Sequence, residues 1–317
     1  MILLLTYSGD TLSTQRVMEE LTTLGREFLR IDTNRYPVEC PVCSIITPDH
    51  TEFQLHTEDG TTSFSPADVK SVWTRCFSPA YYPQECPQEL ISDSYPTAAS
   101  LVEQAVGFCQ NAFWMNHPAD CKRADQKLLQ LQTARHLGFH IPETIATNET
   151  SLVVQFFDSL DGQVVTKSLL PRTVDLRDVG SDFTCLITEE HLEGLVQVRG
   201  KPQIFQRYLP IAREFRVVVV GESCFVGGIE REEPTGLTVD WRNERHLWQE
   251  ERLSDELLDM CQDLAEEMSL PFATIDLAET TDGELYFLEI DHGGEWEFLE
   301  RDAQLPISQA IAEELAK

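Results

Sequence analysis

Two apolar runs joined by Asp282-Gly283 constrain the fold of this chain most strongly. The runs "FATIDLAETT" and "ELYFLEID" each have the length and composition of a strand, and Asp-Gly is a typical tight-turn pair. The sequence therefore predicts an antiparallel hairpin over residues 272–291. Side chains alternate between the two faces of a strand, so Glu289 and Asp291 share one face. Neighbouring strands lie about 4.8 Å apart, which brings Asp276 within reach of both.

Three carboxylates on one face need an explanation, because adjacent like charges repel unless a cation lies between them. Mg²⁺ binds through one or two carboxylates together with the phosphates of a nucleotide, so the hairpin predicts a magnesium and nucleotide site. The alternative is a solvated polar face, since acidic residues are common in this chain. Glu289 interrupts an otherwise apolar strand, and this favours the cation site.

A bound nucleotide also needs cations from other parts of the chain. Lys127 lies in an amphipathic stretch and, taken alone, is readily interpreted as an ordinary surface lysine. Lys167 is the stronger candidate, because it ends the apolar strand "VVT" at residues 164–166. The sequence contains neither a G-x-x-x-x-G-K-[ST] loop nor a G-x-G-x-x-G that follows a strand, so it supports neither a P-loop nor a Rossmann site.

The composition narrows the class of protein. With 54 acidic and 24 basic residues the net charge is -30, which argues against nucleic-acid binding. No stretch approaches the roughly 20 apolar residues of a membrane span, and "MILLLTY" has no basic region before it, so we expect a buried first strand and a cytoplasmic protein. Nine cysteines, an odd number, fit a reducing compartment, and we interpret the C-x-x-C at Cys40 and Cys43 as ordinary thiols.

Periodicity and turn residues predict alternating strands and helices along the whole chain. In the first third we expect strands at 2–6, 27–31 and 69–74, helices at 11–24 and 96–113, and a hairpin at 52–65. In the middle we expect a helix at 124–137, strands at 144–146, 163–171 and 183–187, and a helix from 188. In the last third "IFQRYLP", "REFRVVVVG" and "SCFVGGIER" are expected to form successive antiparallel strands, with helices at 255–268 and 306–316.

The ordered set of motifs resembles the ATP-grasp ligases, and more specifically the graspetide synthetases, which are microviridin-type peptide macrocyclases. The stretches that carry this resemblance are "SVWTRCF", "NHPADCKRADQKLLQLQTARHLGFHIPETIATN", "VVTK", "FQRYLPIAREFRVVVVG", "VDWR" and "DLAETTDGELYFLEIDHGGEWEFLERDAQLPISQAIAEEL". The resemblance implies a mixed α/β (α+β) ATP-grasp fold. It divides the chain into a pre-ATP-grasp domain at 1–118, a central lobe at 119–203 and a C-terminal lobe with an antiparallel sheet at 204–317.

The resemblance also implies roles for individual residues. Lys127 and Lys167 would bind the nucleotide, the hinge residues Gln206, Arg207, Tyr208 and Leu209 would touch adenine, and Glu214 would bind the ribose. Arg216 and Arg242 would face the transferred phosphate. Asp276, Glu289 and Asp291 would hold two Mg²⁺ ions that bind together with ATP. The family usually has asparagine and proline where Asp291 and His292 stand, so this chain adds a negative charge to the metal site.

The implied reaction transfers the γ-phosphoryl group of ATP to an Asp or Glu side chain of a ribosomal precursor peptide, with a leader and an acidic core. A Thr or Ser hydroxyl or a Lys amine then attacks the acyl phosphate and closes an ester or amide ring. Phosphoryl transfer relies on positioning and charge neutralisation, which agrees with the lack of a convincing Ser-His-Asp or Cys-His set.

Several residues have two interpretations at this stage. Arg213 contacts the peptide or forms a surface ion pair. The insertion at 172–198, with Glu190 and His191, is a leader-binding element or a mobile lid. Arg75 is a buried tie between domains or part of the peptide site, and the first of these is favoured.

Two alternative functions stay open, a RimK-like ATP-grasp amino-acid ligase and a non-catalytic nucleotide-binding adaptor. The complete set of lysines and carboxylates disfavours the adaptor, because degeneration would remove some of them. The resemblance also allows a homodimer.

Overall fold

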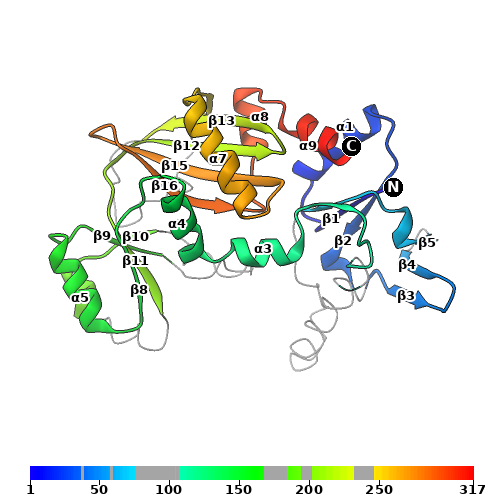
Figure 1. The fold of residues 1–317 in the computed structure, drawn as a ribbon, viewed down its shortest axis with the longest axis horizontal. Coiled ribbons are helices and arrows are strands. Elements are labelled where there is room, and N and C mark those ends of the chain that lie inside the picture. The colour runs from blue at the N-terminus through cyan, green and yellow to red at the C-terminus, as the bar shows by residue number, and fades with distance from the viewer. Residues whose placement is uncertain are drawn as a thin grey trace.

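The computed structural model describes residues 1–36, 39–57, 60–75, 104, 107–167, 184–193, 202–231 and 246–317. The strands of these residues form four sheets, which follow one another along an elongated molecule (Figure 1). Among the described helices, none is long and apolar enough to cross a bilayer.

The N-terminal region is built on a parallel sheet with the strand order β2-β1-β6-β7. Its strands are β1 (Ile2–Thr6), β2 (Phe28–Asp32), β6 (Ser71–Thr74) and β7 (Phe113–Met115), and α1 (Ser13–Thr23) follows β1. An antiparallel sheet of β3 (Val42–Ile46), β4 (Thr51–Thr57) and β5 (Gly60–Phe64) lies beside it, and single 3-10 turns occupy Thr33–Arg35 and Pro66–Asp68. Leu3, Leu4 and Leu5 have no exposed surface, as expected for a parallel strand covered on both faces.

The predictions for this region are largely confirmed, namely the strands near 2–6, 27–31 and 69–74, the helix within 11–24 and the hairpin within 52–65. Asp59 of the predicted turn and most of the predicted helix 96–113 lie outside the described residues. The end of that helix is wrong, because Phe113 begins β7 and pairs with Ser71.

A smaller antiparallel sheet has the strand order β10-β9-β11-β8. Its strands are β8 (Thr144–Thr147), β9 (Val164–Lys167), β10 (Cys185–Leu186) and β11 (Gln203–Arg207), with α6 (Glu189–Glu193) after β10. Helix α5 (Thr150–Ser159), which the sequence analysis did not predict, covers one face of this sheet by packing Val153 and Phe157 against Val164 and Phe205.

The expected ladder from "IFQRYLP" into "REFRVVVVG" is wrong. Strand β11 pairs with β8 and β9, whereas β12 (Ile211–Val220) belongs to another sheet. Pro210 has no N–H group to donate to a ladder, and the chain crosses between the two sheets at residues 208–210.

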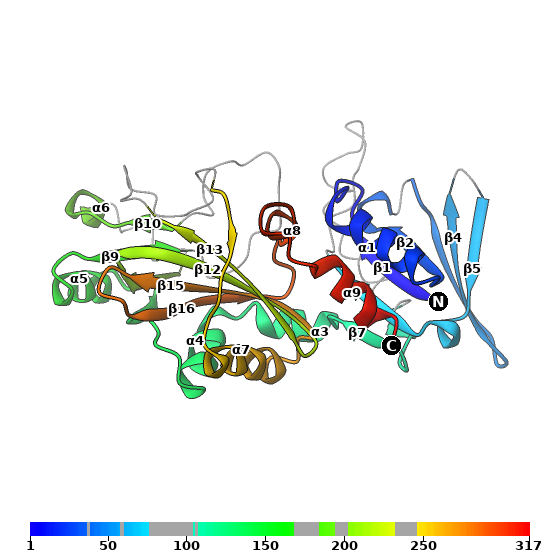
Figure 2. The same cartoon turned by 90° about the horizontal axis from the view of Figure 1, so that it is seen from above.

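The central sheet is antiparallel, with the strand order β14-β13-β12-β15-β16. Its other strands are β13 (Ser223–Glu230), β14 (Gln249–Glu250), β15 (Phe272–Thr280) and β16 (Leu285–Asp291). Helices α4 (Lys127–His136) and α7 (Asp255–Glu267) cover one face (Figure 2). The predicted helix 124–137 is divided, since α3 (Pro118–Ala124) ends before Asp125-Gln126 and α4 begins after it.

The last two helices connect the central sheet to the N-terminal region. Helix α8 (Glu297–Ala303) follows β16, and α9 (Ile307–Leu315) lies beside α1 in both views (Figures 1 and 2). Ile311 and Leu315 of α9 share a hydrophobic core with Ile2, Leu4 and other residues of the N-terminal region. The termini therefore lie close together.

Strand β12 shows which face of the central sheet is available for chemistry. Phe215, Val217 and Val219 belong to the core under α4 and α7, whereas Val218 and Val220 belong to the core shared with α8 and α9. By alternation, Glu214 and Arg216 continue this second face toward the crossing at 208–210. The second face is apolar at one end and charged at the other.

Candidate active site

The hairpin carboxylates lie side by side on the charged end of the second face. Asp276 of β15 is opposite Glu289 of β16 and, on its other side, opposite Arg216 of β12. The register shifts between Asp276 and Leu277, so Leu288 is an extra residue in β16. This bulge lets Phe287 and Ile290 both reach the core while Glu289 faces Asp276. The predicted hairpin and its turn, where Gly283 has φ +85°, are confirmed.

Arg216 binds Asp276 through two parallel hydrogen bonds, each 2.8 Å long, from Nε and Nη2 to the two carboxylate oxygens. The third nitrogen, Nη1, donates to the backbone oxygen of Glu295 at 2.8 Å. Burial raises the pKa of Asp276, as do the nearby charges of Glu289 and Asp291, and Arg216 opposes this rise. The pair is a rigid, charge-assisted contact at the centre of the sheet.

Lys127, the first residue of α4, reaches over the edge of the sheet to Glu289, with 2.7 Å between Nζ and Oε2. Burial disfavours the charged form of Lys127, but Glu289, with Asp291 and Asp276 nearby, raises its pKa above the ordinary value. Two cations thus neutralise two of the three carboxylates that the sequence analysis brought together.

The donor set fits a magnesium ion that arrives with a nucleotide. All three candidate ligands are carboxylates, the hard oxygen donors that Mg²⁺ prefers. Within the described part of the chain, no three His, Cys, Asp or Glu side chains are arranged as a complete metal cage. Because Asp276 is bound by Arg216 and Glu289 by Lys127, a metal would bind here together with phosphate oxygens.

The loop after β16 fixes the orientation of Asp291. Its Oδ1 accepts a hydrogen bond of 2.8 Å from the backbone N–H of Gly293. His292 turns away from the hairpin and lies 3.2 Å from Asp125 between Nε2 and Oδ1. Burial alone would lower the pKa of His292, but the hydrogen bond to Asp125 raises it to about 10. The residue that stands at the family's proline position therefore ties this loop to the link between α3 and α4.

Gly294 is required by close packing against β15. A Cβ atom at this position would overlap the hydroxyl of Thr274, which is buried opposite Asp291. We expect Gly294→Ala to lower the free energy of unfolding by about 1–3 kcal/mol, measured by urea denaturation. Gly107→Ala is the control, because nothing lies within 4 Å of the added atom. Equal stability of the two variants would contradict the packing argument.

Glu214 lies on the same face as Arg216 and is buried. It forms an ion pair of 3.2 Å with Arg231, between Oε1 and Nε. The sequence analysis missed Arg231, although a basic residue directly after the strand "SCFVGGIE" is the signal that could have found it. The candidate site therefore contains a third cation, Arg231, beside Arg216 and Lys127.

Arg213 lies on the opposite face of β12, as alternation predicts. Its Nη2 atom is 2.6 Å from Glu251, and its guanidinium lies 4.8 Å from the ring centre of Phe215. Glu230 and Glu279 also lie close to the Arg213 guanidinium, at 3.9 and 3.7 Å. These contacts favour the ion-pair interpretation, and the peptide contact of Arg213 stays a prediction.

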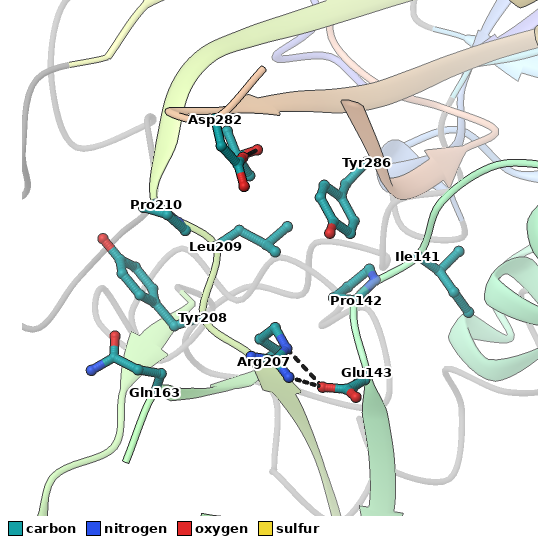
Figure 3. A pocket seen from close by; sticks show the side chains of 11 residues that line it. Ile141, Pro142, Glu143, Gln163, Arg207, Tyr208, Leu209, Pro210, Asp282 and Tyr286 are labelled. Carbon is teal, nitrogen blue, oxygen red and sulfur yellow. Dashed lines mark hydrogen bonds and ion pairs between the residues drawn. The ribbon is translucent and has the colours of Figure 1, made fainter. Parts of the chain in front are cut away.

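The predicted hinge borders a hollow of 610 Å³ (Figure 3). Arg207, Tyr208 and Leu209 line it, and Leu209 extends toward Tyr286 of β16. Arg207 forms an ion pair of 2.5 Å with Glu143 at one side. The carboxylates of the hairpin centre do not line this hollow, so it marks the hinge and not the metal site.

Two further nucleotide candidates lie on the face of the small sheet that α5 leaves uncovered. Lys167 pairs with Ile204, and Gln206 pairs with Val165, so all four side chains share a face opposite Phe205. Gln206 is buried and donates to the hydroxyl of Thr144 at 2.9 Å. This face adjoins the crossing to the central sheet.

The remaining candidates are less defined. Arg242 lies outside the described residues, as does most of the insertion 172–198. In α6, Nδ1 of exposed His191 lies 3.1 Å from the backbone nitrogen of Thr188, which is a local helix-start contact. Glu190 is also exposed on α6. Their role in leader binding stays a prediction.

Comparisons with known proteins identify the family. A family profile described as the MvdD pre-ATP grasp domain matches residues 1–122. The macrocyclase MdnB from Microcystis aeruginosa MRC is 31% identical, with 99% of this chain and 98% of that chain covered and a TM-score of 0.82. The chain belongs to the graspetide synthetases. This confirms the resemblance stated above, and the synthetase has the ATP-grasp fold that it implied.

Two other structures are similar to the synthetase over its whole length. The macrocyclase MdnC from the same organism, bound with the precursor peptide MdnA, is 28% identical over 99% of both chains, with a TM-score of 0.88. A RiPP-associated ATP-grasp ligase from Chryseobacterium gregarium, in complex with ADP and a leader and core peptide, is 24% identical over 99% of this chain and 96% of that chain. Its TM-score of 0.87 supports the fold. A search of curated protein sequences finds no match.

Proposed function

We propose that the synthetase is an ATP- and Mg²⁺-dependent macrocyclase of a ribosomal precursor peptide. The observation that carries the proposal is the pairing of Arg216 with Asp276 and of Lys127 with Glu289 on one face of the central sheet. Phosphoryl transfer needs acidic metal ligands and cationic phosphate donors at one place, and this face supplies both. The printed description of MdnC, a macrocyclase bound with its precursor peptide, supports the substrate class.

The proposal assigns the phosphate end of ATP to a set of cationic and acidic side chains. Lys127 and Lys167 bind phosphate oxygens, and Arg216 stabilises the charge on the transferred group. Asp276, Glu289 and Asp291 hold Mg²⁺, which supplies charge neutralisation at the phosphates when it is bound. Two ions are proposed, as is a role for Arg242 near the same centre.

The base and sugar end of ATP lies toward the crossing between the two sheets. The backbone of Gln206 to Leu209 contacts adenine, and Glu214 accepts hydrogen bonds from the ribose hydroxyls. Arg231 holds the Glu214 carboxylate in place through their buried ion pair. The division of the chain at 1–118, 119–203 and 204–317, a leader-binding element at 172–198 and a homodimer remain predictions of the same proposal.

The proposed reaction has two steps on the peptide. An Asp or Glu side chain attacks the γ-phosphorus of ATP, ADP leaves, and an acyl phosphate forms. A Thr or Ser hydroxyl or a Lys amine then attacks the acyl carbon, loses its proton and expels inorganic phosphate. Each ring therefore costs one ATP and removes one water molecule from the peptide, whether the bond is an ester or an amide.

Mass spectrometry tests this function directly. The substrate is a peptide encoded beside this chain that carries repeated threonine and glutamate or aspartate residues, incubated with enzyme, ATP and Mg²⁺. We expect the peptide to lose the mass of one water for each ring, with one ADP released per ring, and no change without Mg²⁺. A gain of amino-acid masses would instead support the RimK-like ligase, and an unchanged peptide with no ADP released would contradict both.

A further inference from the structure

The short loop that follows β16 shapes the metal site, and side chains from the N-terminal region hold it. Asp291 is the last residue of β16, leads into this loop and accepts a hydrogen bond from the N–H of Gly293. The direction of the Asp291 carboxylate therefore depends on the N–H of Gly293, which belongs to the same peptide group as the carbonyl of His292. We define the metal loop as residues 291–295.

Three backbone carbonyls of the metal loop are held by buried side chains. Nδ2 of Asn116 donates to the oxygen of His292 at 2.9 Å, and Nη1 of Arg75 donates to the oxygen of Gly293. The oxygen of Glu295 accepts from Arg216, the residue that also binds Asp276. The first two donors come from the N-terminal region.

Asn116 connects both strands of the hairpin. It is 1% exposed, and its side chain also bonds the backbone oxygen and nitrogen of Phe272, at 2.8 and 3.0 Å. Phe272 begins β15 and His292 follows β16, so one amide group fixes the distance between the two strand ends. A shift of Asn116 would therefore move Asp291 relative to β15.

Arg75 connects the metal loop to the parallel sheet. Its side chain is 5% exposed, and its guanidinium lies 3.8 Å from Asp10 and 2.7 Å from Glu295. Asp10 is fixed in turn by the hydroxyl of Thr14 at 2.6 Å and by its N–H group. These contacts support the interpretation of Arg75 as a buried tie between domains. Arg75 binds the carbonyl of Gly293, the residue whose N–H orients Asp291, and so holds the peptide group next to the one that carries this N–H.

We propose that Arg75 and Asn116 are positioning residues of the metal site, which make the N-terminal domain a working part of phosphoryl transfer. In this proposal they act by holding the metal loop and not by binding nucleotide or peptide. This inference rests on the metal site of the proposed function. Outer residues that orient a metal ligand typically contribute about 10- to 100-fold in metal affinity or activity.

A direct measurement of metal affinity tests the inference without any peptide. Mn²⁺, as a substitute for Mg²⁺, is titrated by calorimetry into the full chain with a non-hydrolysable ATP analogue. We expect Arg75→Lys, which keeps the charge but loses the guanidinium fork, to bind Mn²⁺ about 10-fold or more weakly than the wild type. Asn116→Ser shortens the side chain that holds the His292 carbonyl, and it is also expected to weaken Mn²⁺ binding. If Arg75→Lys does not fold, the Mn²⁺ affinity of Asn116→Ser tests the inference.

Arg16→Met is the matched control. Arg16 of α1 pairs with Glu300 of α8 at 3.4 Å, so it also joins the N-terminal region to the C-terminal helices, but away from the metal loop. We expect it to bind Mn²⁺ as the wild type does. Wild-type affinity in Arg75→Lys, or equal losses in Arg75→Lys and Arg16→Met, would overturn the inference. A wild type that binds Mn²⁺ but closes no ring contradicts only the macrocyclase proposal.

Discussion

Replacing Asp276 by asparagine is expected to reduce ATP turnover by about 1,000-fold. A bound metal ion stabilises the transition state by several kcal/mol, and about 1.4 kcal/mol corresponds to a factor of ten in rate. Asp276 lies between Glu289 on one neighbouring strand and Arg216 on the other, so the change removes the charge at the centre of the site. Asparagine has nearly the same volume, which keeps the packing of β15. The measurement is peptide-dependent release of ADP at saturating ATP and Mg²⁺.

Glu279→Gln is the matched control for this experiment. Glu279 is on the same strand, three residues along, and faces Arg213 on the other side of the sheet. The substitution removes one negative charge from β15 without touching the candidate site, so we expect turnover close to that of the wild type. Near-normal turnover in Asp276→Asn, or an equal loss in both variants, would rule out the metal assignment.

Replacing Arg216 by methionine is expected to have two large effects. It removes the proposed donor to the transferred phosphate, which should reduce turnover by about 100- to 1,000-fold. It also leaves Asp276 buried without its bidentate partner, and breaking a buried ion pair in this way costs about 3–5 kcal/mol of folding free energy. ADP release and urea denaturation measure the two effects separately.

Arg213→Met provides a comparison on the same strand. Arg213 is 29% exposed, and its nearest acidic partner, Glu251, is 28% exposed, so solvent can replace the lost contact. We expect a loss of only about 0–1 kcal/mol and little change in turnover. If Arg213→Met instead reduced turnover as much as Arg216→Met, Arg213 would have the peptide role that its residue type allows and its contacts do not favour.

Alternation along strands explains why the centre of the site could be predicted from the sequence. Asp276, Glu289 and Asp291 needed only the hairpin register. The place of Arg216 in the site was implied by the resemblance, and its position opposite Asp276 follows from the pairing of β12 with β15. The Leu288 bulge did not disturb this prediction, because it lies between Phe287 and Glu289 and leaves Asp276 opposite Glu289. Local patterns were sufficient where neighbouring strands are joined by a short turn.

Other features depend on contacts between distant parts of the chain. The switch of β11 to the small sheet is decided by its pairing with Thr144 and Val165, and no pattern within "IFQRYLP" predicts it. The contact between Arg75 and Gly293 joins residues 218 positions apart. The resemblance to graspetide synthetases gave roles to Lys167 and Glu214, but it could not indicate that Arg231 holds Glu214.

The packing of α9 against α1 has a consequence for how the chain acquires its structure. Ile2 and Leu4 share a core with Ile311 and Leu315, and the hydroxyl of Ser71 donates to the backbone oxygen of Leu315 at 2.6 Å. Contacts so distant along the chain form slowly, because a long loop must close before they are made. During synthesis on the ribosome, one apolar face of the first sheet therefore stays uncovered until residues 307–315 have been made and have left the ribosome.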